Sequence, residues 1–152
     1  MLILIPGGCG FIGSSLAIFL KQNFKNCAVI SIDNLSRKTS YLNQKRLSKY
    51  NIENIKLDLS SKNCFSKLKK IKQKIDFIID CCAEPAVELS KSNPNLVFNS
   101  NLKSTLNLLE IAKINKSNII YLSTSRVYSI NKINDFFKKI KFNKKIKRKI
   151  KI

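Results

Sequence analysis

The chain has 152 residues, 44% of them hydrophobic, and its 29 lysines and arginines against nine acidic residues give a formal net charge of +20. The length fits one domain, and the hydrophobic fraction is that of a globular protein rather than of a disordered chain. Histidine is absent from the sequence, which excludes histidine-ligated metal sites and any mechanism with a histidine base.

The positive charge does not by itself indicate a nucleic-acid-binding protein. Lysine supplies 25 of the 29 basic residues, whereas base readout and bidentate phosphate contacts favour arginine. Residues 132–152 hold ten of the basic residues and a single acid. We therefore expect no specific nucleic-acid partner, and we interpret residues 132–152 as a solvated, basic Lys/Ile-rich tail. Polyanion binding through this tail, or docking of the tail on a membrane surface as an amphipathic helix, is the alternative.

The five cysteines follow neither a zinc pattern nor a disulfide framework. Cys81 and Cys82 are adjacent, the other three are isolated, and the sequence contains no Cys-x-x-Cys pair. We therefore expect no metal site and a reducing, cytoplasmic environment. Residues 1–20 carry no charged side chain, but Pro6 and four glycines interrupt the run, so we expect neither a membrane anchor nor a signal peptide there.

Short apolar runs alternate with longer amphipathic segments along residues 1–131. The predicted strands are Leu2–Ile5, Ala28–Ile32, Ile55–Leu57, Phe77–Ile79 and Ile119–Leu122. Helical periodicity is clear in Phe11–Phe24, in Asn63–Ile71 and in Leu96–Ile114, the last of which carries Leu102, Leu106, Leu109 and Ala112 along one face. Apolar strands separated by helices are typical of a parallel sheet covered on both faces. The sequence therefore predicts an α/β fold, a Rossmann-type doubly wound parallel sheet of about five strands.

A glycine-rich turn follows the first predicted strand. Residues 6–13 read P-G-G-C-G-F-I-G, a strand-to-helix turn of the kind that binds a pyrophosphate with backbone N–H groups. Asp33 follows Gly13 by 20 residues, at the end of the second predicted strand, where a carboxylate binds the ribose hydroxyls. Strand, turn, helix and acid together predict a dinucleotide site. Asp33 would repel a 2′-phosphate and so favours NAD, although Arg37 and Lys38 in the same loop could accept that phosphate.

Several stretches together resemble the extended short-chain dehydrogenase/reductase family, and more narrowly its NAD-dependent nucleotide-sugar epimerases and dehydratases. They are G-G-C-G-F-I-G-S-S-L-A, D-N-L-S-R-K, A-E-P-A-V-E, N-L-K-S-T-L-N-L-L-E and L-S-T-S-R-V-Y. The second stretch and S-T-S-R-V-Y are most similar to CDP-paratose 2-epimerase-like members. The resemblance covers about residues 1–130 and implies an NAD-binding Rossmann domain over residues 1–131.

The resemblance also implies roles for individual residues. The pyrophosphate would lie on Gly7, Gly10, Phe11, Ile12 and Gly13. Asp33 and Asn34 would bind the adenosine ribose. Asp58 and Leu59 would border adenine, although Asp58 could instead be an ordinary acid at a strand end or a helix cap. Cys81, Cys82 and Ala83 would line the wall at the fourth strand, and Asn101 matches the asparagine of the family's N-x-x-G-T stretch. Thr124 would supply the catalytic hydroxyl. The alternative is that the hydroxyls of this Ser/Thr cluster only hydrogen-bond to unpaired backbone groups at the strand end.

The chain departs from the family pattern in ways that bear on activity. Ser125-Arg126 stands where dehydratases carry an Asp-Glu pair, which favours an epimerase acting on a nucleotide sugar, a CDP-sugar above all. The family's Tyr-x-x-x-Lys lies well downstream of its catalytic hydroxyl, and the only tyrosine after Thr124 is Tyr128. Tyr41/Lys45 has the right spacing, but we expect Tyr41 in the loop after the second strand. We therefore expect a catalytically incomplete chain, truncated before the C-terminal substrate domain or altered by a frame change near residue 132.

Two alternatives to an incomplete epimerase stay open at this point. One is a non-catalytic NAD-binding module or pseudoenzyme, and the other is the polyanion-binding protein that acts through its tail. A sheet that ends after five strands would also leave an edge and apolar surface uncovered, so we expect self-association into a homo-oligomer or aggregation.

Overall fold

The computed structural model of the chain describes residues 1–69, 71–123 and 129–139. It has two compact units, Met1–Leu122 and Ser123–Ile152. The strands of the first unit are β1 (Leu2–Pro6), β2 (Ala28–Asp33), β3 (Glu53–Lys56), β4 (Phe77–Asp80) and β5 (Asn118–Tyr121). Its helices are α1 (Phe11–Asn23), α2 (Lys38–Ser48), α3 (Cys64–Leu68), α4 (Val87–Ser92), α5 (Pro94–Val97), the π-helix η1 (Phe98–Lys103) and α6 (Ser104–Asn115). The second unit contains α7 (Ile130–Lys139).

The five strands form one parallel sheet in the order β3-β2-β1-β4-β5. Leu4 in β1 pairs with Ile30 on one side and with Ile78 on the other. Strand order therefore reverses next to β1, with β2 and β3 to one side and β4 and β5 to the other. In doubly wound sheets, ligands bind at this point of reversal, beyond the carboxyl ends of the strands. The predicted Rossmann-type fold is confirmed.

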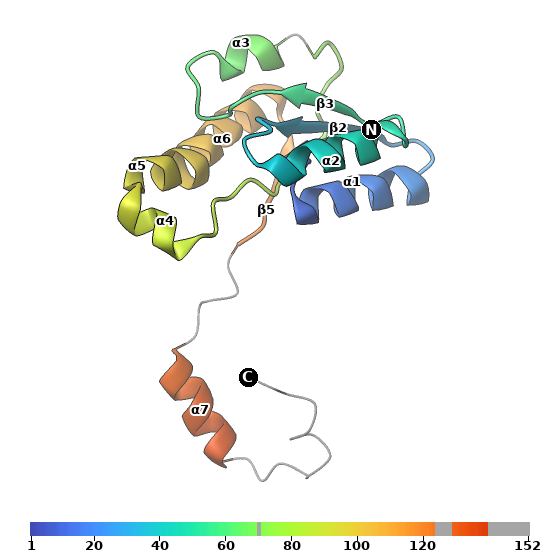
Figure 1. Ribbon diagram of the computed structural model, residues 1–152. Coiled ribbons are helices and arrows are strands. Elements are labelled where there is room, and N and C mark those ends of the chain that lie inside the picture. The colour runs from blue at the N-terminus through green and yellow to red at the C-terminus, as the bar shows by residue number, and fades with distance from the viewer. Residues whose placement is uncertain (70, 124–128, 140–152) are drawn as a thin grey trace. The chain divides into compact units, whose positions relative to one another are not determined.

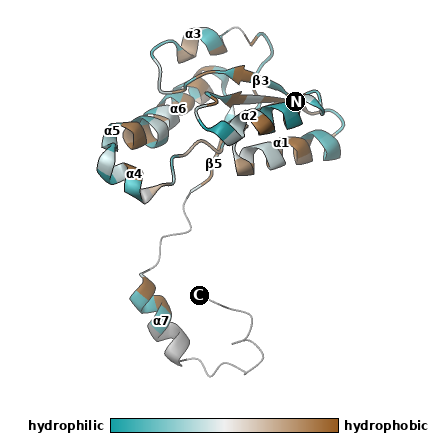
Figure 2. Cartoon of the chain, viewed as in Figure 1, coloured by the Kyte–Doolittle hydropathy of each residue, from teal (hydrophilic) through white to brown (hydrophobic). Residues whose placement is uncertain are grey.

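Helices cover both faces of the sheet, and each face has its own core (Figure 1). One core joins β1 residues such as Leu2 and Leu4 to Leu68 of α3 and Leu108 of α6. The other joins alternate strand residues to Ala17 and Ile18 of α1 and Leu47 of α2. The central strand β1 is therefore buried and apolar on both sides, and Figure 2 shows brown along the central strands, whereas the helices alternate between brown and teal. This double burial explains the continuous apolar runs in the sequence.

Helix α1 packs against the sheet through its small residues. Gly13, Ser14, Ala17 and Ile18 are buried, whereas the side chains of Phe11 and Phe19 are 88% and 56% exposed. Small side chains let the helix axis approach the strands closely, so the large aromatic residues of the predicted apolar stripe are left outside.

The predicted helix 96–114 is three consecutive segments, α5, η1 and α6. The buried residues of α6 are Ser104, Leu108, Ile111 and Ala112. Leu102, Leu106 and Leu109 remain 46–51% exposed, so only Ala112 of the predicted apolar face is buried. Apolar residues of α6 lie along two stripes of the helix. The stripe that packs on the sheet is the one that contains the small residues Ser104 and Ala112.

Helix α2 corrects the expectation for Tyr41, which lies in this helix and not in a loop. Only Ser40 and Leu47 of α2 are buried, so the hydrophobic periodicity of the sequence did not indicate this helix.

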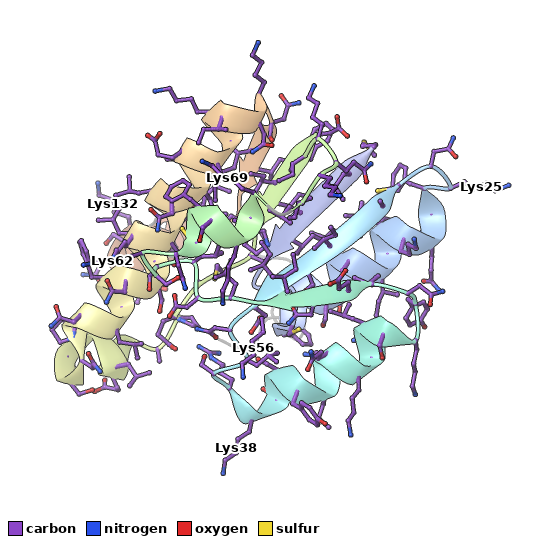
Figure 3. The ribbon with its side chains drawn as sticks, turned by 90° about the horizontal axis from the view of Figure 1, so that it is seen from above. Lys25, Lys38, Lys56, Lys62, Lys69 and Lys132 are labelled. Atoms are coloured by element: carbon purple, nitrogen blue, oxygen red, sulfur yellow. The ribbon has the colours of Figure 1, made fainter. Side chains whose placement is uncertain are left out.

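Among the residues that the structure describes, no helix is long and apolar enough to cross a membrane. Figure 3 shows Lys25, Lys38 and Lys62 pointing outward on different sides of the first unit, so these three cations do not share one face.

Candidate dinucleotide site

A cleft opens at the carboxyl ends of β1, β2, β3 and β4, where strand order reverses. Four loops line it, one after each of these strands. The predicted site residues in its lining are Gly7, Gly10, Asp33, Asn34, Asp58, Leu59, Cys81, Cys82 and Ala83. The fold therefore brings together residues that lie as far as 76 positions apart in the sequence.

The glycine turn forms the floor of the cleft, and Gly7 and Gly13 show why its geometry requires glycine. Gly7 has a φ of +68°, in the left-handed region that side chains disfavour, and a Cβ there would lie 2.6 Å from the Cys81 carbonyl oxygen. Gly13 packs the start of α1 onto the turn, and a Cβ on it would overlap the carbonyl oxygen of Gly7. The turn thus presents bare backbone to the cleft, which lets a pyrophosphate approach closely.

The first turn of α1 supplies N–H groups at the edge of this floor. The first backbone hydrogen bond of the helix runs from the Ser14 N–H to the Gly10 carbonyl at 3.0 Å. The N–H groups of Phe11, Ile12 and Gly13 therefore precede the helical ladder, and the positive end of the helix dipole lies with them. The side chains of Phe11 and Ile12 are exposed and are not in the cleft lining, so their predicted role would be a main-chain one.

Asn43 of α2 anchors the turn from the side, a role that sequence reasoning missed. Its Nδ2 donates to the Cys9 carbonyl at 2.9 Å and approaches the Gly10 carbonyl at 3.5 Å. Asn43 is one of many asparagines in the chain, so the sequence gives no sign of this contact, which only the packing of α2 beside α1 reveals.

The carboxylate of Asp33 is held beside the glycine turn. Its Oδ2 accepts from the Cys9 N–H at 3.1 Å, and its Oδ1 accepts from the Leu35 N–H at 2.8 Å. Each oxygen keeps acceptor capacity for a ligand hydroxyl, because a carboxylate oxygen has two lone pairs. Two backbone donors thus fix the orientation of Asp33 before any ligand arrives.

Asp58 lines the cleft but is also engaged locally. Its Oδ1 accepts from the Ser60 N–H at 2.8 Å and from the Ser60 hydroxyl at 2.7 Å, as expected of an acid that shapes the turn into α3. Leu59 is 3% exposed and belongs to the core. The predicted adenine border therefore combines an apolar backing with an acid that is already hydrogen-bonded.

The part of the wall formed by Cys81 and Cys82, directly after β4, is uncharged. Burial, followed by the nearby carboxylates of Asp80, Asp33 and Asp58, raises the pKa of Cys82 to about 12. Burial and Asp80 raise the pKa of Cys81 to about 11. Both thiols stay protonated at neutral pH, and all five cysteines of the chain are free. This wall suits an uncharged ring better than a phosphate.

Asp80, at the end of β4, is buried behind this wall with 1% exposure. Its Oδ1 accepts from the Cys82 N–H at 2.9 Å, and its Oδ2 lies 3.0 Å from the Thr105 hydroxyl, which is also 2.9 Å from the Asn101 carbonyl. The Thr105 hydroxyl therefore shares its proton between the Asp80 carboxylate and the Asn101 carbonyl in a three-centre hydrogen bond. Burial raises the pKa of Asp80, against the lowering effect of the Cys82 and Thr105 hydrogen bonds.

Asp80→Asn is expected to stabilise the chain increasingly as the pH rises. Because the pKa of Asp80 is raised on folding, the stability that its neutral form contributes is fully present below the ordinary pKa of 3.8 and is lost as the pH rises through the folded value. Asparagine keeps the hydrogen bonds of the neutral acid. Urea unfolding at a series of pH values should show the variant gaining stability relative to the wild-type chain as the pH rises above the ordinary pKa of 3.8. A difference that does not change with pH would contradict this account of Asp80.

Asn101 and Glu84 hold the loop after β4, and Glu84 then reaches across the cleft. Asn101 accepts from the Glu84 N–H at 2.7 Å and donates to the Glu84 carbonyl at 3.1 Å. Asn101 is not in the cleft lining, so the structure places it behind the loop. The carboxylate of Glu84 pairs with the guanidinium of Arg37 at 2.7 Å. Glu84 belongs to the A-E-P-A-V-E stretch, but its partner is 47 positions away, so the pair could not be read from the sequence. Thr124 lies outside the described residues.

This geometry can be compared with known proteins. Residues 3–144 match the NAD dependent epimerase/dehydratase family. The chain belongs to this family. The family description names NAD as the cofactor, and several relatives are named for their action on nucleotide sugars.

Among curated relatives, CDP-paratose 2-epimerase of Salmonella typhi is 41% identical over 132 residues, which cover 84% of this chain and 38% of the relative. Among solved structures, Helicobacter pylori ADP-L-glycero-D-manno-heptose-6-epimerase has a TM-score of 0.71 at 33% identity, over 84% of this chain and 40% of that one. UDP-glucose 4-epimerase from Bifidobacterium longum, solved with NAD+ and UDP, has a TM-score of 0.70 at 28% identity, over 85% and 38%. The chain thus spans about two-fifths of the length of the relatives it matches.

The residues present fit NAD. A Cβ at Gly7 or at Gly13 would collide with backbone atoms of Cys81 or of the turn itself. The floor on which a pyrophosphate would lie is therefore bare backbone, and the amides of α1 border it. The Asp33 carboxylate keeps lone pairs for ligand hydroxyls beside this floor, and Cys82 contributes a neutral wall.

Proposed function

We propose that this chain is the NAD-binding part of a nucleotide-sugar epimerase. The observation that carries the proposal is the placement of Asp33, whose carboxylate is fixed by the N–H groups of Cys9 and Leu35 beside the glycine turn. A carboxylate in this position binds the adenosine ribose through its two hydroxyls. Bound NAD supplies a hydride acceptor for a carbon that bears a hydroxyl.

The described residues would bind and orient the cofactor. Gly7, Gly13 and the first turn of α1 would hold the pyrophosphate through main-chain groups and the helix dipole. Asp33 would fix the adenosine end. The wall of Cys81 and Cys82 would exclude water without adding charge. Together these contacts would hold the reactive end of the cofactor at one position relative to a bound sugar.

The substrate class we propose is a CDP-sugar, and the reaction an epimerisation. The support is the 41% identity to a CDP-paratose 2-epimerase together with Ser125-Arg126, which offers no acid/base pair for the loss of water. Thr124 is the proposed catalytic hydroxyl.

We further propose that the 152-residue polypeptide does not complete this reaction by itself. Of its two Tyr-x-x-x-Lys matches, Tyr41/Lys45 lies on α2, where the Lys45 ammonium lies 4.8 Å from the centre of the Tyr41 ring. Tyr41 is not in the cleft lining, and the other match, Tyr128/Lys132, belongs to the S-R-V-Y stretch. No acid/base tyrosine is therefore assigned beside Thr124.

The test uses one preparation of the chain for two readouts. NAD at about 100 times its Kd should raise the Tm by about 5–10 °C, while incubation with NAD and a CDP-sugar should give no epimerised product by chromatography. An unchanged Tm would contradict the binding proposal. Product formation that Thr124→Ala abolishes would instead show a complete active site and contradict the proposed incompleteness.

A further inference from the structure

Arg37 and Glu84 face each other across the mouth of the cleft. Arg37 ends the loop that begins with Asp33, and Glu84 lies in the loop after β4, so the pair joins two of the four loops that line the cleft. The Arg37 side chain is 52% exposed and that of Glu84 is 13% exposed. The acid is thus the more firmly embedded partner, and it determines where the guanidinium lies.

Glu84 is fixed independently of Arg37. Asn101 makes two hydrogen bonds to its main chain, and its Oε1 accepts from the Ala86 N–H at 3.1 Å. Its Oε2 is left for Arg37, at 2.7 Å. Because the acceptor is held in advance, the pair forms with less loss of side-chain freedom than an ordinary surface ion pair.

Arg37 lies where a free cation could bind the 2′-phosphate of NADP. In this fold, an arginine near the ribose-binding acid accommodates the 2′-phosphate of NADP. Arg37 follows Asp33 by four positions, and both line the same cleft. A guanidinium paired with a carboxylate offers a phosphate much less attraction than a free one, and the carboxylate itself repels the phosphate.

We infer that Glu84 is a specificity-determining residue for the cofactor, in addition to Asp33. By holding Arg37, Glu84 withholds that cation from the 2′-phosphate and so keeps the site selective for NAD over NADP. The inference rests on the proposed function, since it requires that the cleft bind NAD. It assigns Glu84 no part in the chemistry of the sugar.

The experiment measures Kd for NAD and for NADP by titration calorimetry, at one fixed ionic strength, on four proteins. They are the wild-type chain, Glu84→Gln, Glu84→Gln combined with Arg37→Gln, and Glu88→Gln as the matched control. Glu88 loses the same charge, but it pairs with Lys91 at 3.5 Å on an exposed surface of α4. Glutamine at position 84 keeps an oxygen for the Ala86 N–H, which limits disturbance of the loop.

Glu84→Gln should raise the affinity for NADP relative to NAD by about tenfold. The double variant should lose this gain, and Glu88→Gln should leave the ratio of affinities unchanged. A Glu84→Gln chain that binds NAD normally but keeps the wild-type ratio would overturn the inference while leaving the proposed function intact. A wild-type chain that binds neither dinucleotide would overturn both.

Discussion

Gly13→Ala is expected to reduce NAD affinity by more than about 100-fold, because it disrupts several main-chain contacts to the pyrophosphate at once. The added Cβ would overlap the carbonyl oxygen of Gly7 and lie 2.9 Å from the Cα of Gly8. Both atoms are backbone, so α1 has to move away from the turn. The same carbonyl accepts the Gly10 N–H at 2.9 Å, and the floor of the cleft would change with it.

The cost in stability should be smaller than the loss of binding, about 1–3 kcal/mol for overpacking a close contact. Ser15→Ala is the matched control, because Ser15 is an exposed residue of the same helix. Calorimetric titration with NAD measures the affinity, and urea unfolding confirms that each chain is folded. A folded Gly13→Ala chain that binds NAD within about twofold of the wild type would show that the packing of α1 on the turn is not required.

Asp33→Asn should weaken NAD binding by roughly 10- to 100-fold. Hydrogen bonds to a charged group contribute about 1.5–3 kcal/mol, and asparagine removes the charge while keeping the size of the side chain. The substitution also replaces one of the two oxygens that accept from Cys9 and Leu35, so the orientation of the remaining acceptor is less well fixed.

Asp76→Asn is the control for this experiment. Asp76 also accepts a hydrogen bond from a backbone N–H, that of Leu2 at 2.8 Å. It directly precedes β4 and lies beside the first residue of β1, at the opposite end of these strands from the cleft. NAD affinity should therefore stay at the wild-type value in Asp76→Asn. Equal affinities in the two variants would remove Asp33 from the site.

The fold and the centre of the cleft could be predicted because their signals are local. Strands buried on both faces are apolar throughout, and a glycine turn followed by an acid 20 residues later is a short-range pattern. Packing between residues far apart in the sequence could not be predicted in this way. The sequence of α6 offers apolar residues on more than one side, so the run of residues 102–109 does not indicate that Leu108 is buried while Leu106 and Leu109 stay exposed.

The missed functional contacts have the same origin. Arg37 directly precedes α2 and Asn43 lies within it, both as ordinary polar residues. Their partners, Glu84 and Cys9, lie 47 and 34 positions away. Asn101 was predicted from the family motif to serve the cofactor, and the structure places its amide on the main chain of Glu84. Such roles depend on which loops meet at the carboxyl edge of the sheet, which only the assembled fold determines.

The most direct test of the account is a calorimetric titration of NAD into the folded 152-residue chain. The account predicts saturable binding of one NAD per chain, with an affinity that Asp33→Asn lowers. A chain that shows cooperative unfolding in urea, and is therefore folded, but releases no binding heat at any temperature tested would contradict the assignment of this cleft as an NAD site.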